Sequence, residues 1–210
     1  MSGKSEKLKL KDFGFKTTAF PWLALGFVYL AINFLVTGTA RFEFMYGLLY
    51  AISFICIALV LGAKKPGLLS GLVVATVGTL TVFVQMITFN MMFAVGLAVV
   101  ALIVLLADIF GAIKWKSTQG VQYLTFVPFF LTFAWTAYYF YGRFTGGLPL
   151  PPATILNHAG IALLSLDSIL RVAGAHKKVW LSYIALIAIV FGALWLTAGL
   201  GWGLQLNSIF

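Results

Sequence analysis

The sequence predicts an all-α integral membrane protein, a polytopic bundle of seven transmembrane helices. Of its 210 residues 62% are apolar and only 9% are charged, and the mean hydropathy is +1.05. A soluble domain carries about 25% charged residues, so this chain has too few to cover a water-facing surface. Its apolar residues also fall into separate runs of roughly 20 residues, the length that a helix needs to cross the hydrocarbon core.

The first four apolar runs cover residues 20–37, 44–62, 68–86 and 91–113. The first follows a polar, lysine-rich segment and lacks a small-residue cleavage site, so we interpret it as a retained span. Only residues 87–90 separate the third run from the fourth, but together these two runs far exceed the ~20 residues of one crossing. A tight turn near Asn90 is therefore predicted.

The last three runs cover residues 121–141, 153–173 and 179–200. Gly and Pro deny a helix to the connection at 143–152, and Pro152 suits the first turn of the helix that follows. We count seven spans, with six as the fallback because the break at 87–90 is short. The predicted organisation is a cytoplasmic basic segment, a single transmembrane domain and a short external tail, at residues 1–19, 20–200 and 201–210.

The basic residues predict the orientation. With the N-terminus in the cytoplasm, Arg41 and Arg143 are the basic residues on the outer side, and all the others fall in the inner segments. The positive-inside rule then predicts a multi-pass protein of the cell (plasma) membrane with an external C-terminus. Because these residues form short clusters between apolar runs, the net charge of +9 reads as an orientation signal, and no nucleic-acid partner is expected.

Small residues at helical spacing predict where helices pack closely. Gly67, Gly71, Ala75 and Thr79 follow one another at intervals of four, with Gly78 beside them. Ala185, Ala188 and Gly192 repeat the pattern more weakly in the last span. These faces pack either within the bundle or against a second copy or another membrane subunit. The bilayer itself is the first expected partner.

Two acids lie within predicted spans, Asp108 in the fourth and Asp167 in the sixth. A charge at membrane depth is costly, so such a residue normally faces the bundle interior or a cavity. At ~1.5 Å per residue both lie roughly 8–9 Å inside the cytoplasmic boundary. They are candidates for a paired-acid site, in which like charge raises one pKa and permits proton-linked gating.

Structural ion pairs explain the same residues equally well. Asp167 and Arg171 are spaced i, i+4, so they face each other on one helix. Asp108 is within reach of Lys114 or Lys116, whose side chains can extend toward the membrane surface.

Three further polar residues fall within the predicted spans: His158, Asn33 and Gln85. His158 titrates nearest to neutral pH and is the pH-sensing candidate, although a hydrogen bond between helices is its commoner role. Nine residues separate it from Asp167, so the two side chains face opposite sides of the helix. Asn33 and Gln85 are expected to hydrogen-bond between helices.

An aromatic stripe in the fifth span is formed by Phe126, Phe129, Phe130 and Phe133. It is interpreted first as lipid-facing or core-filling. The functional alternative is a hydrophobic constriction that gates by dewetting.

Enzyme chemistry is disfavoured. The two histidines, His158 and His176, lie in different parts of the chain and do not suit an internal haem, and no cluster of His, Cys or acidic residues has metal-ligand spacing. We therefore expect no catalytic residue, no cofactor and no metal. The single cysteine, Cys56, excludes a disulfide framework within the chain.

Two functions remain. The leading hypothesis is a channel or transporter for a small solute or ion, with Asp108, Asp167 and His158 lining or gating the path. The alternative is a non-catalytic subunit that scaffolds or anchors a larger membrane complex, which the short loops and the scarcity of intramembrane polar groups favour.

Overall fold

The computed structural model describes residues 18–34, 42–63, 67–86, 91–110, 120–147, 152–175 and 180–201. Its elements are all helical: α1 (Ala19–Ile32), α2 (Phe42–Gly62), α3 (Leu68–Met86), α4 (Met91–Ile109), the 3₁₀-helix η3 (Val121–Phe126), α5 (Val127–Thr145), α6 (Pro152–Val172) and α7 (Trp180–Gly201). The prediction of an all-α helical bundle is confirmed.

The helices correspond one to one with the seven apolar runs. The third and fourth runs form separate helices, which end at Met86 and begin at Met91, and α6 begins at Pro152. The fifth run differs from the prediction, because η3 precedes α5. Pro128 explains where α5 starts, since proline lacks a backbone N–H and fits the first turn of an α-helix.

Two other ends also differ from the predicted runs. The α-helical part of α1 ends at Ile32 and passes into a π-helical turn at Asn33 and Phe34. Helix α4 ends at Ile109, four residues before the predicted end of the run. Lys114 and Lys116 lie outside the described residues.

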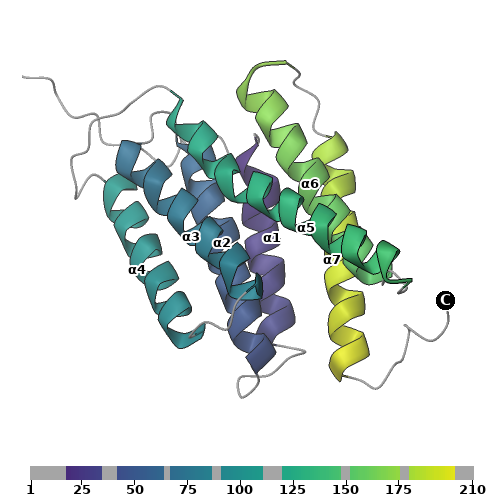
Figure 1. The fold of residues 1–210 in the computed structure, drawn as a ribbon. Helices are drawn as coiled ribbons and strands as arrows, with labels where there is room; N and C mark the ends of the chain where they lie inside the picture. The colour runs from purple at the N-terminus through teal and green to yellow at the C-terminus, as the bar shows by residue number, and fades with distance from the viewer. Residues whose placement is uncertain are drawn as a thin grey trace, which may run out of the picture.

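The helices lie side by side in the order shown in Figure 1, with α4 at one edge and the α6–α7 pair at the other. Helix α2 packs against α1, α3 and α4, while α6 packs mainly against α7. Helix α5 crosses the front of the bundle obliquely and contacts α3 and α6. Through η3, its N-terminal end also reaches α2, α3 and α6.

The interior is filled by large apolar side chains from α1, α2 and α6 together with small residues at close approaches. Trp22, Leu25, Leu49, Ile57 and Leu164 are among the most deeply buried. Gly71 and Gly78 of the predicted seam face Val121 and Pro128, so this seam packs against η3 and α5 within the chain.

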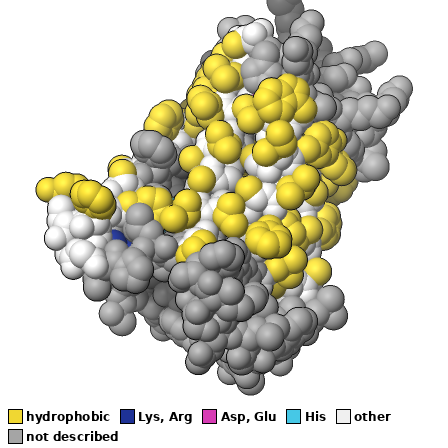
Figure 2. All heavy atoms as spheres, turned by 90° about the vertical axis from the view of Figure 1, so that its right-hand side faces the viewer, with side chains coloured by type: hydrophobic (Ala, Val, Ile, Leu, Met, Phe, Trp, Pro, Cys, Tyr) yellow, Lys and Arg dark blue, Asp and Glu magenta, His cyan; other side chains and the backbone are white. Residues whose placement is uncertain are grey.

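The outer surface is strongly apolar. On the side where α6 and α7 lie, Figure 2 shows mostly hydrophobic side chains among the described residues, with no acidic side chain in view. Large exposed residues there include Leu163 of α6 and Ile187 and Phe191 of α7. On the opposite edge, Met92, Val100 and Ile103 of α4 are exposed in the same way.

One helical stretch among the described residues, Ile155–Val172, meets the length and hydropathy expected of a membrane span. The described parts of α1, α2, α3, α4 and α7 contain shorter apolar stretches of 10–17 residues.

Candidate functional site: a buried acid shared by three helices

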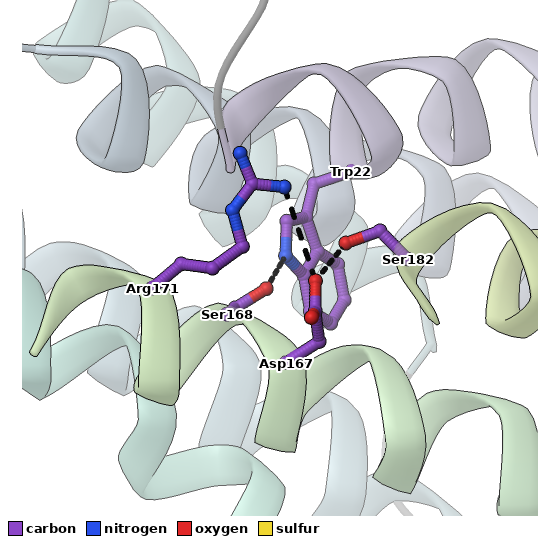
Figure 3. A network of polar contacts seen from close by, with 5 residues as sticks. All are labelled: Trp22, Asp167, Ser168, Arg171 and Ser182. Atoms are coloured by element: carbon purple, nitrogen blue, oxygen red, sulfur yellow. Dashed lines mark hydrogen bonds and ion pairs between the residues drawn. The ribbon is translucent and has the colours of Figure 1, made fainter. Parts of the chain in front are cut away.

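Asp167 lies at the centre of a polar cluster formed by α1, α6 and α7 (Figure 3). Its side chain has 0% exposure. The Ser182 hydroxyl of α7 donates a hydrogen bond to Asp167 Oδ2. Nη1 of Arg171 lies 3.9 Å from the same oxygen, one turn along α6. The i, i+4 geometry anticipated from the sequence is therefore present in the fold.

Ser168, the next residue along α6, extends the cluster to α1. The indole Nε1 of Trp22 donates a hydrogen bond of 2.9 Å to Ser168 Oγ (Figure 3). Both side chains are completely buried. We refer to Trp22, Asp167, Ser168, Arg171 and Ser182 as the Asp167 cluster.

The positions of these residues in their helices favour both charges. Ser182 is in the first turn of α7, where unpaired backbone N–H groups and the helix dipole stabilise an anion such as Asp167. Arg171 is in the last turn of α6, where the dipole stabilises a cation. The cluster thus combines an ion pair with two favourable helix termini.

Arg171 holds its charge close to Asp167 without a direct hydrogen bond. Its side chain is 8% exposed, and the 3.9 Å separation exceeds hydrogen-bond length. Nη1 makes no hydrogen bond with any described residue. A buried charge of this kind depends strongly on its partner, because removing one member leaves the other uncompensated.

Asp108 belongs to a different part of the bundle. It accepts a hydrogen bond from the Ser70 hydroxyl across the interface between α3 and α4. Helix α4 lies at the edge opposite α6 and α7, with the other helices between (Figure 1). The two acids match in predicted depth but not in lateral position, so the structure does not bring them together as the paired-acid site requires.

The remaining sequence candidates lie apart from the cluster. His158 is partly buried and stacks edge-to-face with Phe140 of α5, with ring centroids 6.3 Å apart. Asn33 is buried against Gly47, where a Cβ atom would overlap its amide, so it joins the end of α1 to α2. Gln85 lies in α3, but its side chain is outside the described part of the structure.

The aromatic stripe of the fifth span does not form one inward-facing surface. Phe126 is 1% exposed and lies in the core, while Phe130 is 66% exposed on the outer face. The change from 3₁₀-helix to α-helix between these two residues alters the angular spacing on which the stripe depends. The side chains of Phe129 and Phe133 lie outside the described residues.

Sequence reasoning missed the uncharged partners in the bundle. Tyr29 OH accepts a hydrogen bond of 2.8 Å from Asn157 Nδ2, which connects α1 to α6 a second time. Ser53 and Thr81 connect α2 to α3 through their hydroxyls at 2.7 Å. A depth comparison could have identified Ser182, because it begins α7 just after the loop that follows the end of α6 near Asp167.

Groups of three or more His, Cys, Asp or Glu side chains suited to a metal ion do not occur among the described residues. The described geometry is that of a buried ion pair with hydroxyl and indole partners. Comparison of the chain with protein-family models, with curated proteins and with solved structures returned no match.

Proposed function

We propose that the chain spans the cell membrane seven times, with its N-terminus in the cytoplasm and its C-terminus outside. The apolar runs and the predominance of Lys and Arg in alternate loops support this arrangement. Exposed Phe, Leu and Ile side chains on the edges formed by α4 and α7 suit contact with lipid tails.

Within this arrangement, we propose a channel or transporter for a small solute or ion that is gated through Asp167. The observation that carries the proposal is the complete burial of an acid whose partners come from three helices. Protonation of Asp167 would leave Arg171 without its counter-charge and weaken the Ser182 hydrogen bond. A proton or cation at this point would therefore change how α6 and α7 pack.

Vesicle flux tests this proposal. The purified protein is reconstituted in liposomes, and flux of protons, K⁺, Cl⁻ and glycerol is measured against protein-free vesicles. We expect at least one flux above background. In Asp167→Asn it should fall by about tenfold or more, equivalent to about 1.4 kcal/mol in the barrier.

Asp108→Asn provides the matched control, because it makes the same change at a membrane-depth acid with a serine partner. Its flux should remain close to that of the wild type. Background flux of all four species, or equal flux in wild type and Asp167→Asn, would contradict the proposal.

The scaffold function remains the second candidate, and the hydroxyl partners of both acids favour it. Ser70 and Ser182 each satisfy an acid from a neighbouring helix, which is how polar groups stabilise helix contacts in membranes. Mild detergent extraction followed by native electrophoresis separates the two functions. Migration of the chain alone, or as a homo-oligomer, argues against the scaffold.

A further inference from the structure

The described helices form two groups that differ in how closely their backbones approach. In the first group, which we call the α1–α4 unit, α2 packs against α1, α3 and α4. The second group is the α6–α7 hairpin, in which α6 and α7 contact each other more than any other neighbour. Figure 1 shows the hairpin at one edge of the bundle, beside α1 and beneath the oblique α5.

Backbone contact holds the α6–α7 hairpin together at two levels. A Cβ at Gly160 would lie 3.0 Å from the carbonyl oxygen of Ala185. A Cβ at Gly192 would lie 2.8 Å from the backbone nitrogen of Asn157 and 2.9 Å from the carbonyl oxygen of Ala153. Such close approach favours movement of the two helices as one body, because neither can shift without a backbone clash.

The junction between α1 and α6 is made instead by long side chains. Trp22 reaches Ser168, and Tyr29 reaches Asn157, through hydrogen bonds of 2.9 Å and 2.8 Å. Trp22 and Tyr29 are seven residues apart, about two turns, so both project from the same face of α1. The two bonds therefore connect one face of α1 to α6 at two depths.

One of these bonds is adjacent to the buried acid. Ser168 follows Asp167 in α6, so a single turn of this helix binds Trp22 of α1 and Ser182 of α7. A change at Asp167 thus acts on both neighbours of α6 at once. The second bond, between Tyr29 and Asn157, lies three turns away along α6 and has no charged member.

We propose that the α6–α7 hairpin moves as a rigid unit against the α1–α4 unit, and that the Trp22–Ser168 and Tyr29–Asn157 hydrogen bonds hold it in the described position. This inference deepens the proposed transport function and rests on it for its role. It assigns the moving element and the two contacts that break, in the manner of a hinge or shear motion between packed units.

Distances between spin labels test the motion directly. The single cysteine, Cys56, is replaced by Ala, and labels are placed at Val99 of α4 and Ile187 of α7, which are both exposed. The protein is measured in lipid nanodiscs by pulsed electron–electron resonance. In the Tyr29→Phe/Ser168→Ala variant, we expect the distance distribution to shift or to gain a second population.

Label pairs inside each unit show whether the units stay rigid. Leu72 with Val99 reports on the α1–α4 unit, and Leu163 with Ile187 reports on the hairpin. Both distributions should be the same in the wild type and in the variant. Equal broadening of these pairs would mean general loosening and would overturn the inference.

A matched control removes a comparable pair of hydroxyls that does not connect the units. Ser53→Ala/Thr81→Val breaks the buried bond between α2 and α3, and the distance between Val99 and Ile187 should not change. If the Tyr29→Phe/Ser168→Ala protein cannot be recovered folded, Tyr29→Phe alone removes one oxygen and is measured in the same way. An unchanged distance between Val99 and Ile187 in the folded variant would overturn the inference.

The two proposals fail separately. Flux that depends on Asp167, together with unchanged distances, would retain the transport function and exclude this motion. A shifted distance without flux of any tested species would retain the motion of the hairpin and exclude the transport of those species.

Discussion

Asp167 and Arg171 place opposite charges in a part of the chain that is otherwise almost entirely apolar. Their side chains are 0% and 8% exposed, so neither can rely on water for its solvation. Ser182 and the ends of α6 and α7 supply part of what water would provide. The stability of the pair therefore depends on both charges being present.

Removing only the cation should be more damaging than removing both charges. We expect Arg171→Met to lower the free energy of unfolding by about 3 kcal/mol, because Asp167 is left as an uncompensated buried charge. The Asp167→Asn/Arg171→Met double variant should recover most of this loss. Unfolding in detergent micelles, followed by tryptophan fluorescence, measures both, and equal losses in the two variants would contradict the prediction.

Two glycines in different surroundings predict opposite effects of the same substitution. Gly192→Ala should destabilise the protein by about 1–3 kcal/mol, because its methyl group would meet the backbone of α6. Gly96→Ala meets nothing within 4 Å and should stabilise α4 by about 0.5–1 kcal/mol. Thermal unfolding in detergent compares them, and a melting temperature that changes in the same direction for both would contradict the packing described for Gly192.

At the scale of the elements, hydropathy predicted where each apolar run lies but not its helical type. Residues 121–126 and the start of α5 form one continuous apolar run, yet Pro128 separates 3₁₀ from α-helical geometry near its beginning. The consequence is that η3 contacts α2, α3 and α6, while α5 crosses the bundle obliquely. A hydropathy run contains no information about this crossing angle.

The contact between α3 and α4 is predicted to include a measurable coupling between Ser70 and Asp108. In a double-mutant cycle with Ser70→Ala and Asp108→Asn, we expect a coupling of about 0.6 kcal/mol, the average for polar contacts between membrane helices. Unfolding free energies of the wild type, the two single variants and the double variant provide the measurement. Strict additivity of the two single effects would show that this hydrogen bond does not stabilise the helix pair.

For the whole molecule, the proposed orientation places Thr145 outside the cell and Ala175 inside. Both residues are exposed in the structure. In cells expressing the protein with Cys56→Ala, an impermeant maleimide should label Thr145→Cys directly and Ala175→Cys only after permeabilisation. Labelling of both positions from the same side would exclude an odd number of crossings between them and overturn the proposed topology.

The candidate site was only partly accessible to sequence reasoning. The i, i+4 spacing correctly predicted the approach of Arg171 to Asp167, because this geometry is local to one helix. The partners Ser182 and Trp22 were missed, since they come from other helices. Asp108 was grouped with Asp167 because depth can be counted from a sequence, whereas lateral position cannot.

The sequence by itself determined the helical runs, the breaks between them and the residues whose polarity conflicts with an apolar environment. Those features depend on hydropathy, on helix rise and on proline geometry, which act over a few residues. Only the tertiary structure decided that α6 and α7 form one hairpin, that α1 reaches α6 through Trp22 and Tyr29, and that the two acids are separated. These outcomes depend on how side chains from distant segments fit together, a property that no single apolar run contains.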